Sequence, residues 1–241
     1  MATYVIVHGA WSGGHAWWKV RPLLRVAGHE VFTPALTGLG ERAHLATPEV
    51  DLDTHIDDVV GVLEYEDLRE VVLVGHSYGG VVISGAAERL APRLSQLVYR
   101  DAEVPEDGQA EYDLVPPDER AGYEELARTR GDGWRIPPPV PESLPDDIDP
   151  DVRWVLSRMV PHPAATFAQP VRLANAAAAS LPRVYIFCSE GKGGHPAPAY
   201  VERARSEPGW LYRELPTGHA PHVTAPQDLV DLLLELVPTD R

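Results

Sequence analysis

The sequence has few of the residues on which several kinds of site depend. Of its 241 residues only Cys188 is a cysteine, so the chain cannot form an internal disulfide or a cysteine-rich metal site. Lysine and arginine total 21 against 36 aspartates and glutamates, which gives a formal net charge of -15. This charge repels nucleic acid and anionic lipid, because both are densely negative. We therefore expect neither a nucleic-acid nor a membrane partner.

Long hydrophobic runs are also missing. No stretch approaches the length of a membrane span, and the first apolar run reaches His8 before it is long enough for a signal peptide. The sequence therefore predicts a cytoplasmic protein. Apolar residues make up 44% of the chain, which is enough for the core of one domain of ordinary size. A homodimer is compatible with these features, which do not specify the oligomeric state.

Short apolar, β-branched runs alternate along the chain with helical patterns. The runs cover residues 4–7, 30–33, 71–74, 96–99, 184–187 and 211–215. Helical patterns cover residues 15–27, 54–65, 78–90 and 225–236. This alternation predicts an α/β fold, with a mostly parallel central sheet that helices cover on both faces.

The alternation stops between residues 105 and 180. Strand signals vanish there and prolines cluster, above all in 137–150. An acidic, proline-rich stretch is typical of a disordered loop. The segment nevertheless contains Trp134, Trp154 and Phe167 among other apolar residues, which favours packed structure. We predict a helical cap at 105–180, inserted into an α/β core formed by 1–104 and 181–241.

The stretch from Gly75 to Gly80 carries the strongest motif of the chain. Its residues, Gly-His-Ser-Tyr-Gly-Gly, follow a predicted strand and precede a predicted helix. A G-x-S-x-G motif in this context places a serine in a sharp strand-to-helix turn, where its hydroxyl can act as a nucleophile. Glycine-flanked serines also occur in plain turns. The strand and helix on either side favour Ser77 as the nucleophile.

A turn of small residues after the first strand predicts an oxyanion hole. Residues 7–14 read Val-His-Gly-Ala-Trp-Ser-Gly-Gly. In serine hydrolases of this kind, a backbone N–H from that turn and the N–H after the nucleophile together stabilise the developing oxyanion. This assigns the backbone N–H groups of Ala10 and Tyr78, while Gly9 lets the chain approach the substrate.

The general base is expected near the carboxyl terminus, after the last strand. His219 lies directly after that strand, in the chain order serine, acid, histidine. His222 is the competing candidate three residues later, and the turn position favours His219. The pair lacks the helical i, i+4 spacing of a metal site. We therefore predict no metal ligand here.

Two carboxylates could complete a catalytic triad with this histidine. Glu190 follows the strand at 184–187, where the acid is expected, and would hold the histidine in its productive tautomer. Asp101 closes the preceding strand and could reach the same histidine from there. Either residue could instead be structural, with Asp101 paired to Arg100 and Glu190 in a solvated loop. We favour Glu190 and retain Asp101 as the alternative.

At these residues the chain resembles one branch of the α/β-hydrolases. The stretches that match are 7–10 with Trp17, the pattern from Leu23 to Val31, the turn at 75–80 and Gly218-His219. They are similar to plant methylesterases and hydroxynitrile lyases, and to bacterial pyrethroid-hydrolase-like carboxylesterases. The branch commonly has aspartate as its acid after the strand at 184–187, whereas this chain has Glu190 followed by the glycine-rich stretch 191–194.

Two positions separate the hydrolases of that branch from its lyases. The resemblance implies threonine at the position of Gly9 and lysine at the position of Ala220 in a lyase. This sequence has neither. A lyase of that kind needs a cation to stabilise departing cyanide, and alanine cannot supply one. Hydrolysis is therefore the better interpretation.

The sequence thus predicts a cofactor-independent serine carboxylesterase that acts on a small hydrophobic ester. Gly9, Trp11, Trp134 and Trp154 are the residues we expect at the substrate. The same fold also serves tailoring enzymes of secondary metabolism, which perform cyclisation or carbon–carbon cleavage, and non-catalytic small-molecule receptors. The sequence alone leaves these two alternatives open.

Overall fold

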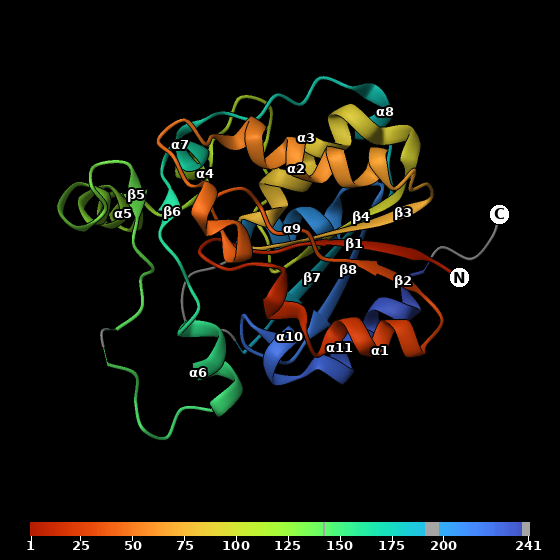
Figure 1. Cartoon of the computed structure of the whole chain (residues 1–241). Coiled ribbons are helices and arrows are strands. Elements are labelled where there is room, and N and C mark those ends of the chain that lie inside the picture. Colours follow the sequence, from red (N-terminus) through yellow and green to blue (C-terminus); the bar gives the residue numbers. More distant parts are fainter. Residues whose placement is uncertain (142, 191–197, 238–241) are drawn as a thin grey trace.

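Six parallel strands form the central sheet of the computed structural model, which describes residues 1–141, 143–190 and 198–237. Their order across the sheet is β2-β1-β3-β4-β7-β8 (Figure 1). The strands are β1 (Thr3–Val7), β2 (Glu30–Phe32), β3 (Val71–His76), β4 (Leu94–Arg100), β7 (Arg183–Cys188) and β8 (Trp210–Leu215). Each overlaps one of the six predicted runs, and the predicted α/β fold is confirmed.

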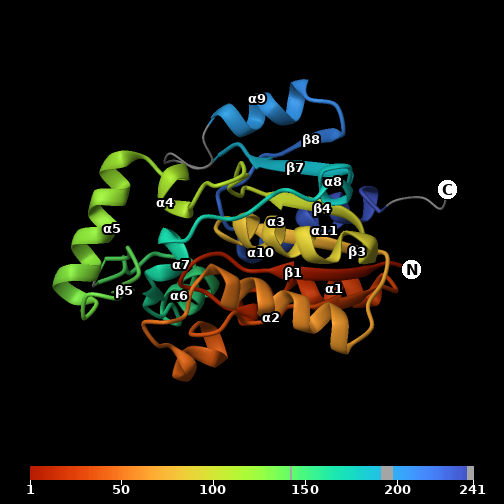
Figure 2. The ribbon, with the colours of Figure 1, turned by 90° about the horizontal axis from the view of Figure 1, so that it is seen from above.

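Helices cover both faces of this sheet. In Figure 1, α2 (Leu52–Tyr65) and α3 (Gly79–Leu90) lie above it, and α1 (Val20–Val26), α10 (Pro221–Thr224) and α11 (Pro226–Glu235) lie below it. Helix α9 (Pro198–Ser206) lies along β8 (Figure 2). Side chains of a strand alternate between faces, so Val5 and Val7 of β1 pack in the cluster that contains α2 and α3. Tyr4 and Ile6 pack in the other cluster, with α1 and α11.

The helix predicted at 15–27 is divided in two. A short 3-10 helix, η1 (Gly14–Trp17), precedes α1. Pro22 explains the break, because it has no N–H to donate to the carbonyl four residues earlier. Two further 3-10 helices, η2 (Gly40–Leu45) and η3 (Ala91–Arg93), lie in connections. None of the described helices has the length and apolar character needed to cross a membrane.

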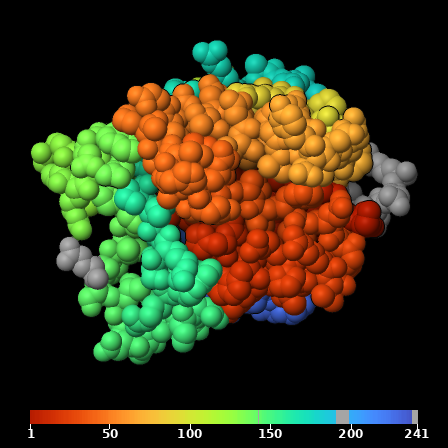
Figure 3. All heavy atoms as spheres, in the orientation of Figure 1, coloured from red at the N-terminus to blue at the C-terminus, as the bar shows by residue number. Residues whose placement is uncertain are grey.

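The segment 105–180 joins β4 to β7. It contains α4 (Glu111–Leu114), α5 (Pro117–Arg130), α6 (Pro150–Leu156), α7 (Ala165–Ala168) and α8 (Ala176–Ala179). It also contains an antiparallel pair, β5 (Arg135–Ile136) and β6 (His162–Pro163). We did not predict this pair, because two-residue strands show no periodicity. Helices α4 to α7 lie beyond the carboxyl ends of the strands, and α6 lies against the amino-terminal residues (Figures 1 and 3).

Strand register decides which residues meet at the carboxyl edge of the sheet. Val7 pairs with Gly75 of β3, and His76 of β3 pairs with Arg100 of β4. Cys188 of β7 pairs with Leu215 of β8. The turns that follow β1, β3, β4, β7 and β8 therefore lie side by side. This edge collects residues that are far apart in the sequence, as is usual for ligand sites of parallel sheets.

Candidate active site

The turn after β3 holds Ser77 in a strained backbone conformation. Its φ is 52°, in the left-handed region that residues other than glycine rarely adopt. The Gly80 N–H closes the turn by donating to the Ser77 carbonyl oxygen over 2.8 Å. Gly75 and Gly79 make room for the turn. A Cβ on Gly75 would stand 2.6 Å from the Gly79 carbonyl oxygen, and one on Gly79 would stand 2.7 Å from that of Val7.

His219 is paired with Asp101. The Nδ1 of His219 lies 2.6 Å from Oδ2 of Asp101, a carboxylate that is 1% exposed. The other oxygen, Oδ1, accepts the backbone N–H of Cys188 over 3.2 Å. Because an ionised carboxylate only accepts hydrogen bonds, Nδ1 of His219 carries the proton and Nε2 has a free electron pair. This is the tautomer that a general base needs.

The preference for Glu190 as the partner of this histidine does not agree with the geometry. The structure records no hydrogen bond between Glu190 and His219, both of which are described, and the Glu190 N–H donates to the Thr217 carbonyl oxygen over 2.9 Å. The reason lies in the sheet order: β4 is the neighbour of β7, so Asp101 at its end reaches the site from the adjacent strand. The glycine-rich stretch 191–194 lies outside the described residues.

His76, directly before Ser77, contacts the other nitrogen of the base. The Nε2 atoms of His76 and His219 lie 3.1 Å apart. Since His219 has its proton on Nδ1, His76 is the donor of this hydrogen bond. Burial and the neighbouring Arg100 guanidinium lower the pKa of His76 well below its usual value, so it is neutral. The structure records no hydrogen bond between the described side chains of Ser77 and His219; in unliganded enzymes this bond is often long.

Arg100, fully buried at the end of β4, holds the two histidines of the last turn. One of its guanidinium nitrogens donates to the His219 carbonyl oxygen, and another donates to Nδ1 of His222 over 3.3 Å. His222 stacks on Trp17 with ring centroids 4.7 Å apart. Burial and Arg100 lower the pKa of His222 well below its usual value. His222 is therefore a neutral, packed side chain. Both histidines line the cavity that contains Ser77, but only His219 is paired with a carboxylate.

The expected oxyanion donors also lie at this edge. The backbone N–H groups of Ala10 and Tyr78 donate to no other described residue. His8 orders the turn after β1, which contains Ala10. Its Nε2 accepts the Leu36 N–H over 3.1 Å, and its Nδ1 donates to the Gly9 carbonyl oxygen over 2.8 Å. Gly9 packs so closely that a Cβ there would stand 3.1 Å from Cβ of Ser77.

The side chains of Trp11 and Tyr78 have different surroundings. The Trp11 indole N–H donates to the Ile136 carbonyl oxygen over 2.9 Å, and its backbone N–H donates to Nδ1 of His162. These bonds fix Trp11, one of the residues expected at the substrate, which lines both cavities beside Ser77. The Tyr78 ring is fully buried, and its hydroxyl lies 2.9 Å from Nδ1 of His55. Tyr78 thus offers its backbone to the site and its ring to the core.

Two cavities of similar size meet at Ser77 and His219. We call the first the apolar chamber; its volume is about 250 Å³, and its walls include Pro139, Val140, Val152, Val155, Leu156, Met159 and Val223. The second, the acidic chamber, has about 240 Å³ and is walled by Glu103, Glu111, Val115, Glu119, Tyr123 and Phe167. Ala10, Trp11, Ser77 and His219 line both. Two differently lined spaces therefore adjoin Ser77.

Trp134 and Trp154, predicted at the substrate, line neither chamber. Trp154 on α6 packs against Trp18, with ring centroids 4.7 Å apart, and against His15. Trp154 therefore joins α6 to η1 and to the residue that follows η1. Trp134 follows α5, and the Arg135 guanidinium covers its ring at 4.9 Å. The prediction was wrong because composition cannot tell which face of a cap helix an indole occupies.

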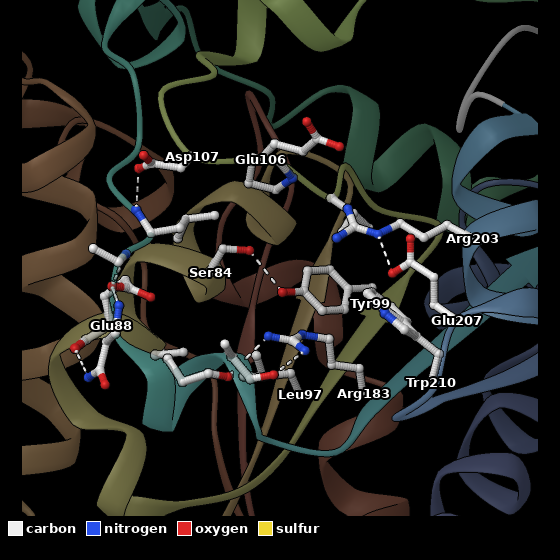
Figure 4. A pocket seen from close by; sticks show the side chains of 18 of the residues that line it. Ser84, Glu88, Leu97, Tyr99, Glu106, Asp107, Arg183, Arg203, Glu207 and Trp210 are labelled. Carbon is white, nitrogen blue, oxygen red and sulfur yellow. Dashed lines mark hydrogen bonds and ion pairs between the residues drawn. The ribbon is translucent and has the colours of Figure 1, made fainter.

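A larger cavity of about 530 Å³ lies elsewhere, between α3, β4, α8, α9 and β8 (Figure 4). The Ser84 hydroxyl points across it to the Tyr99 hydroxyl, 2.9 Å away, and Arg203 is paired with Glu207. No histidine is among its lining residues, so its serine has no base. In the described part of the chain, no group of three or more His, Cys, Asp or Glu side chains is placed to hold a metal ion.

Comparison with known proteins finds similar sequences and similar folds. The model of the alpha/beta hydrolase family matches residues 4–232. A carbendazim hydrolyzing esterase of Nocardioides sp. (strain SG-4G) is 41% identical over 98% of this chain and 100% of its own.

Two solved structures match in fold. One is a methylesterase of Arabidopsis, with a TM-score of 0.73 at 24% identity, over 98% of this chain and 99% of that one. The other is a pyrethroid hydrolase of Sphingobium faniae JZ-2, with a TM-score of 0.69 at 23% identity, over 98% of this chain and 97% of that one. The resemblance to this branch is confirmed.

Proposed function

Because the chain belongs to the alpha/beta hydrolase family, we propose that it is a serine carboxylesterase that hydrolyses small hydrophobic esters. Its triad is Ser77, His219 and Asp101, with Asp101 in place of the Glu190 favoured by the sequence. The observation that carries this proposal is the position of His219, between the buried Asp101 carboxylate and the cavity edge with Ser77. No cofactor takes part.

The reaction proceeds by acyl transfer. The Ser77 hydroxyl attacks the ester carbonyl carbon while Nε2 of His219 takes its proton, and the backbone N–H groups of Ala10 and Tyr78 stabilise the oxyanion. His219 then protonates the alcohol that leaves. A water molecule, deprotonated by His219, hydrolyses the acyl-enzyme, and Asp101 stabilises the imidazolium in both steps.

His76 takes part as a hydrogen-bond donor to the base. Before substrate binds, its Nε2–H occupies the electron pair of His219 Nε2. The Ser77 hydroxyl must replace that donor before it can transfer its proton. A small rotation of the His219 ring about its hydrogen bond to Asp101 would accomplish the exchange, because His76, Ser77 and His219 line the same cavity.

The apolar chamber supports a hydrophobic substrate. Val155 and Leu156 of α6 and Val223 of α10 face it, and it can hold a short aliphatic or aromatic group. The names of three similar proteins agree: one is an esterase that hydrolyses carbendazim, one a methylesterase and one a pyrethroid hydrolase. We therefore place the apolar half of the ester in this chamber.

Hydrolysis of p-nitrophenyl acetate and butyrate tests the proposal. We expect turnover by the wild type and a loss of about a millionfold in kcat for Ser77→Ala and for His219→Ala, as is typical when a triad loses its nucleophile or base. Ser84→Ala is the matched control, since Ser84 lies in the cavity of Figure 4, away from His219. A folded wild type without activity would favour a tailoring enzyme or a receptor instead.

A further inference from the structure

Glu111 is a buried side chain of the acidic chamber with an unpartnered oxygen. It is 3% exposed, and its Oε2 has no hydrogen-bond partner. Glu111 begins the short helix α4 and lines the chamber together with Ser77 and His219. A buried polar atom without a partner is costly, and such atoms are rare in native structures. Its position beside the reacting groups indicates that a ligand supplies the missing partner.

The surroundings of Glu111 are negative and aromatic. Glu103 and Glu119 line the same chamber. Burial, together with these two neighbouring charges, raises the pKa of Glu111 well above its usual value. Glu119 already accepts the Tyr123 hydroxyl, whereas Oε2 of Glu111 has no hydrogen-bond partner. No lysine or arginine is among the described lining residues.

The aromatic walls of the chamber suit a flat group. The ring of Trp11 lies 5.4 Å from that of Tyr123 and 5.9 Å from that of Phe167, measured between centroids. Aromatic faces attract both planar rings and cations. The net charge of -15 further favours the approach of a cation over that of an anion.

We propose that Glu111 binds an amidine-like N–C–N group of the substrate, as found in amidines and in amino-substituted nitrogen heteroaromatics. This inference rests on the proposed esterase function and adds a substrate class to it: one half of the ester is apolar, and the other carries N–H donors. An ionised carboxylate accepts two parallel hydrogen bonds from an amidinium. A protonated carboxyl donates one bond and accepts one, which fits the neutral N–H and N edge of an aminoheteroaromatic ring.

Benzamidine and acetophenone form a matched pair of probes, because they have nearly the same shape and only benzamidine has N–H donors. Their binding is measured by calorimetry on the Ser77→Ala protein, so that no turnover is needed. We expect benzamidine to bind about 10- to 100-fold more tightly, the effect of charge-assisted hydrogen bonds. Equal binding of the two probes would overturn the inference, and this comparison needs no variant of Glu111.

The residue itself is tested by Glu111→Gln in the same Ser77→Ala background. We expect the preference for benzamidine to fall at least tenfold, while the melting temperature stays the same or rises because a buried acid has been removed. Glu64→Gln on α2 is the control, since Glu64 is exposed and the loss of charge is the same. A preference that survives Glu111→Gln would contradict the assignment.

The outcome is separable from that of the proposed function. If wild type hydrolyses p-nitrophenyl esters but the Ser77→Ala protein does not prefer benzamidine, only the substrate class is wrong. If benzamidine is preferred and wild type is inert, the chamber binds such a group in a protein that is not an esterase.

Discussion

Three residues other than glycine adopt left-handed backbone conformations around the reaction site. They are Trp11 with φ 60°, Ser77 with φ 52° and Asp101 with φ 46°. They follow β1, β3 and β4, which are adjacent strands of the sheet. Such conformations cost on the order of 1 kcal/mol or more each, and they persist where the surrounding structure fixes them. Three of the six described residues other than glycine with positive φ thus present the cavity wall, the proposed nucleophile and the proposed acid.

Gly9 controls how closely the oxyanion turn approaches the nucleophile. A methyl group at this position would stand 3.1 Å from Cβ of Ser77 and 3.2 Å from Nδ1 of His76. We expect Gly9→Ala to shift the Ala10 N–H and to lower kcat for p-nitrophenyl butyrate about 10- to 100-fold, the size of effect that small misplacements cause. Gly61→Ala on α2 is the control, because its Cβ would meet nothing within 4 Å. Equal activity of the two variants would show that the close approach is not needed.

Some of these residues could be identified from the sequence, and others could not. Ser77 and His219 were named because a glycine-rich turn after a strand has a local signature. The pairing of Asp101 with His219 depends on which strands are neighbours, and the chain order does not reveal that. Glu111 and Arg100 carried no signal at all, since an acidic or basic residue is usually a solvated one.

At the scale of elements, the ends of the strands predicted from the sequence lie within two residues of the observed ends. The inner strands β1, β3, β4 and β7 are mostly buried on both faces, so they form continuous apolar runs bounded by turn residues, and such runs are easy to recognise. The edge strands β2 and β8 are partly exposed. The cap was harder. Its helices α4, α7 and α8 have four residues each, too few for a periodic pattern, and β6 contains a proline. Tertiary packing, rather than local propensity, fixes these short elements.

Helix α6 depends on Trp154 for its attachment to the core. The indole packs against Trp18 and His15, while Val155 and Leu156 on the same helix form the wall of the apolar chamber. We expect Trp154→Ala to lower the free energy of unfolding by about 1 to 3 kcal/mol, because a half-buried aromatic contact is lost. The KM for p-nitrophenyl butyrate should rise with a smaller change in kcat.

Trp134→Ala is the matched control for this helix, since Trp134 lines neither chamber and contacts Arg135. Its melting temperature can fall, but its KM should stay near that of wild type. Denaturant unfolding gives the stability of both variants, and steady-state kinetics with p-nitrophenyl butyrate gives their KM values. A KM that rises equally in both would mean that Trp154 does not position α6.

At the scale of the whole molecule, the stability should depend on pH through buried histidines. Burial lowers the pKa of His8 to about 3 and that of His55 to about 4, and it lowers the pKa of His76, His162 and His222 well below the usual value. Below a pH of about 6.5 the unfolded chain binds protons that the folded chain excludes. The contribution of these histidines to the free energy of unfolding is therefore fully present above that pH. It is lost as the pH falls toward the pKa values of the folded state.

The size of this effect can be measured by urea unfolding between pH 7.5 and 4.5. One excluded proton costs about 1.4 kcal/mol per pH unit, and several histidines contribute. Glu111 acts in the opposite direction, because its raised pKa removes stability as the pH rises above the usual carboxyl value. We expect a net loss on acidification, and a free energy of unfolding that stays constant from pH 7 to 5 would contradict the burial of these rings.

The parallel sheet brings Ser77, His219 and Asp101 from the ends of three separate strands to one edge, and Asp101 is the proposed acid. The direct measurement is kcat for p-nitrophenyl butyrate in Asp101→Asn and Glu190→Gln, measured beside wild type. We expect Asp101→Asn to lose about ten-thousandfold, because the amide no longer holds the productive histidine tautomer, and Glu190→Gln to remain within about twofold. A severe loss in Glu190→Gln with an active Asp101→Asn would contradict the triad of Ser77, His219 and Asp101.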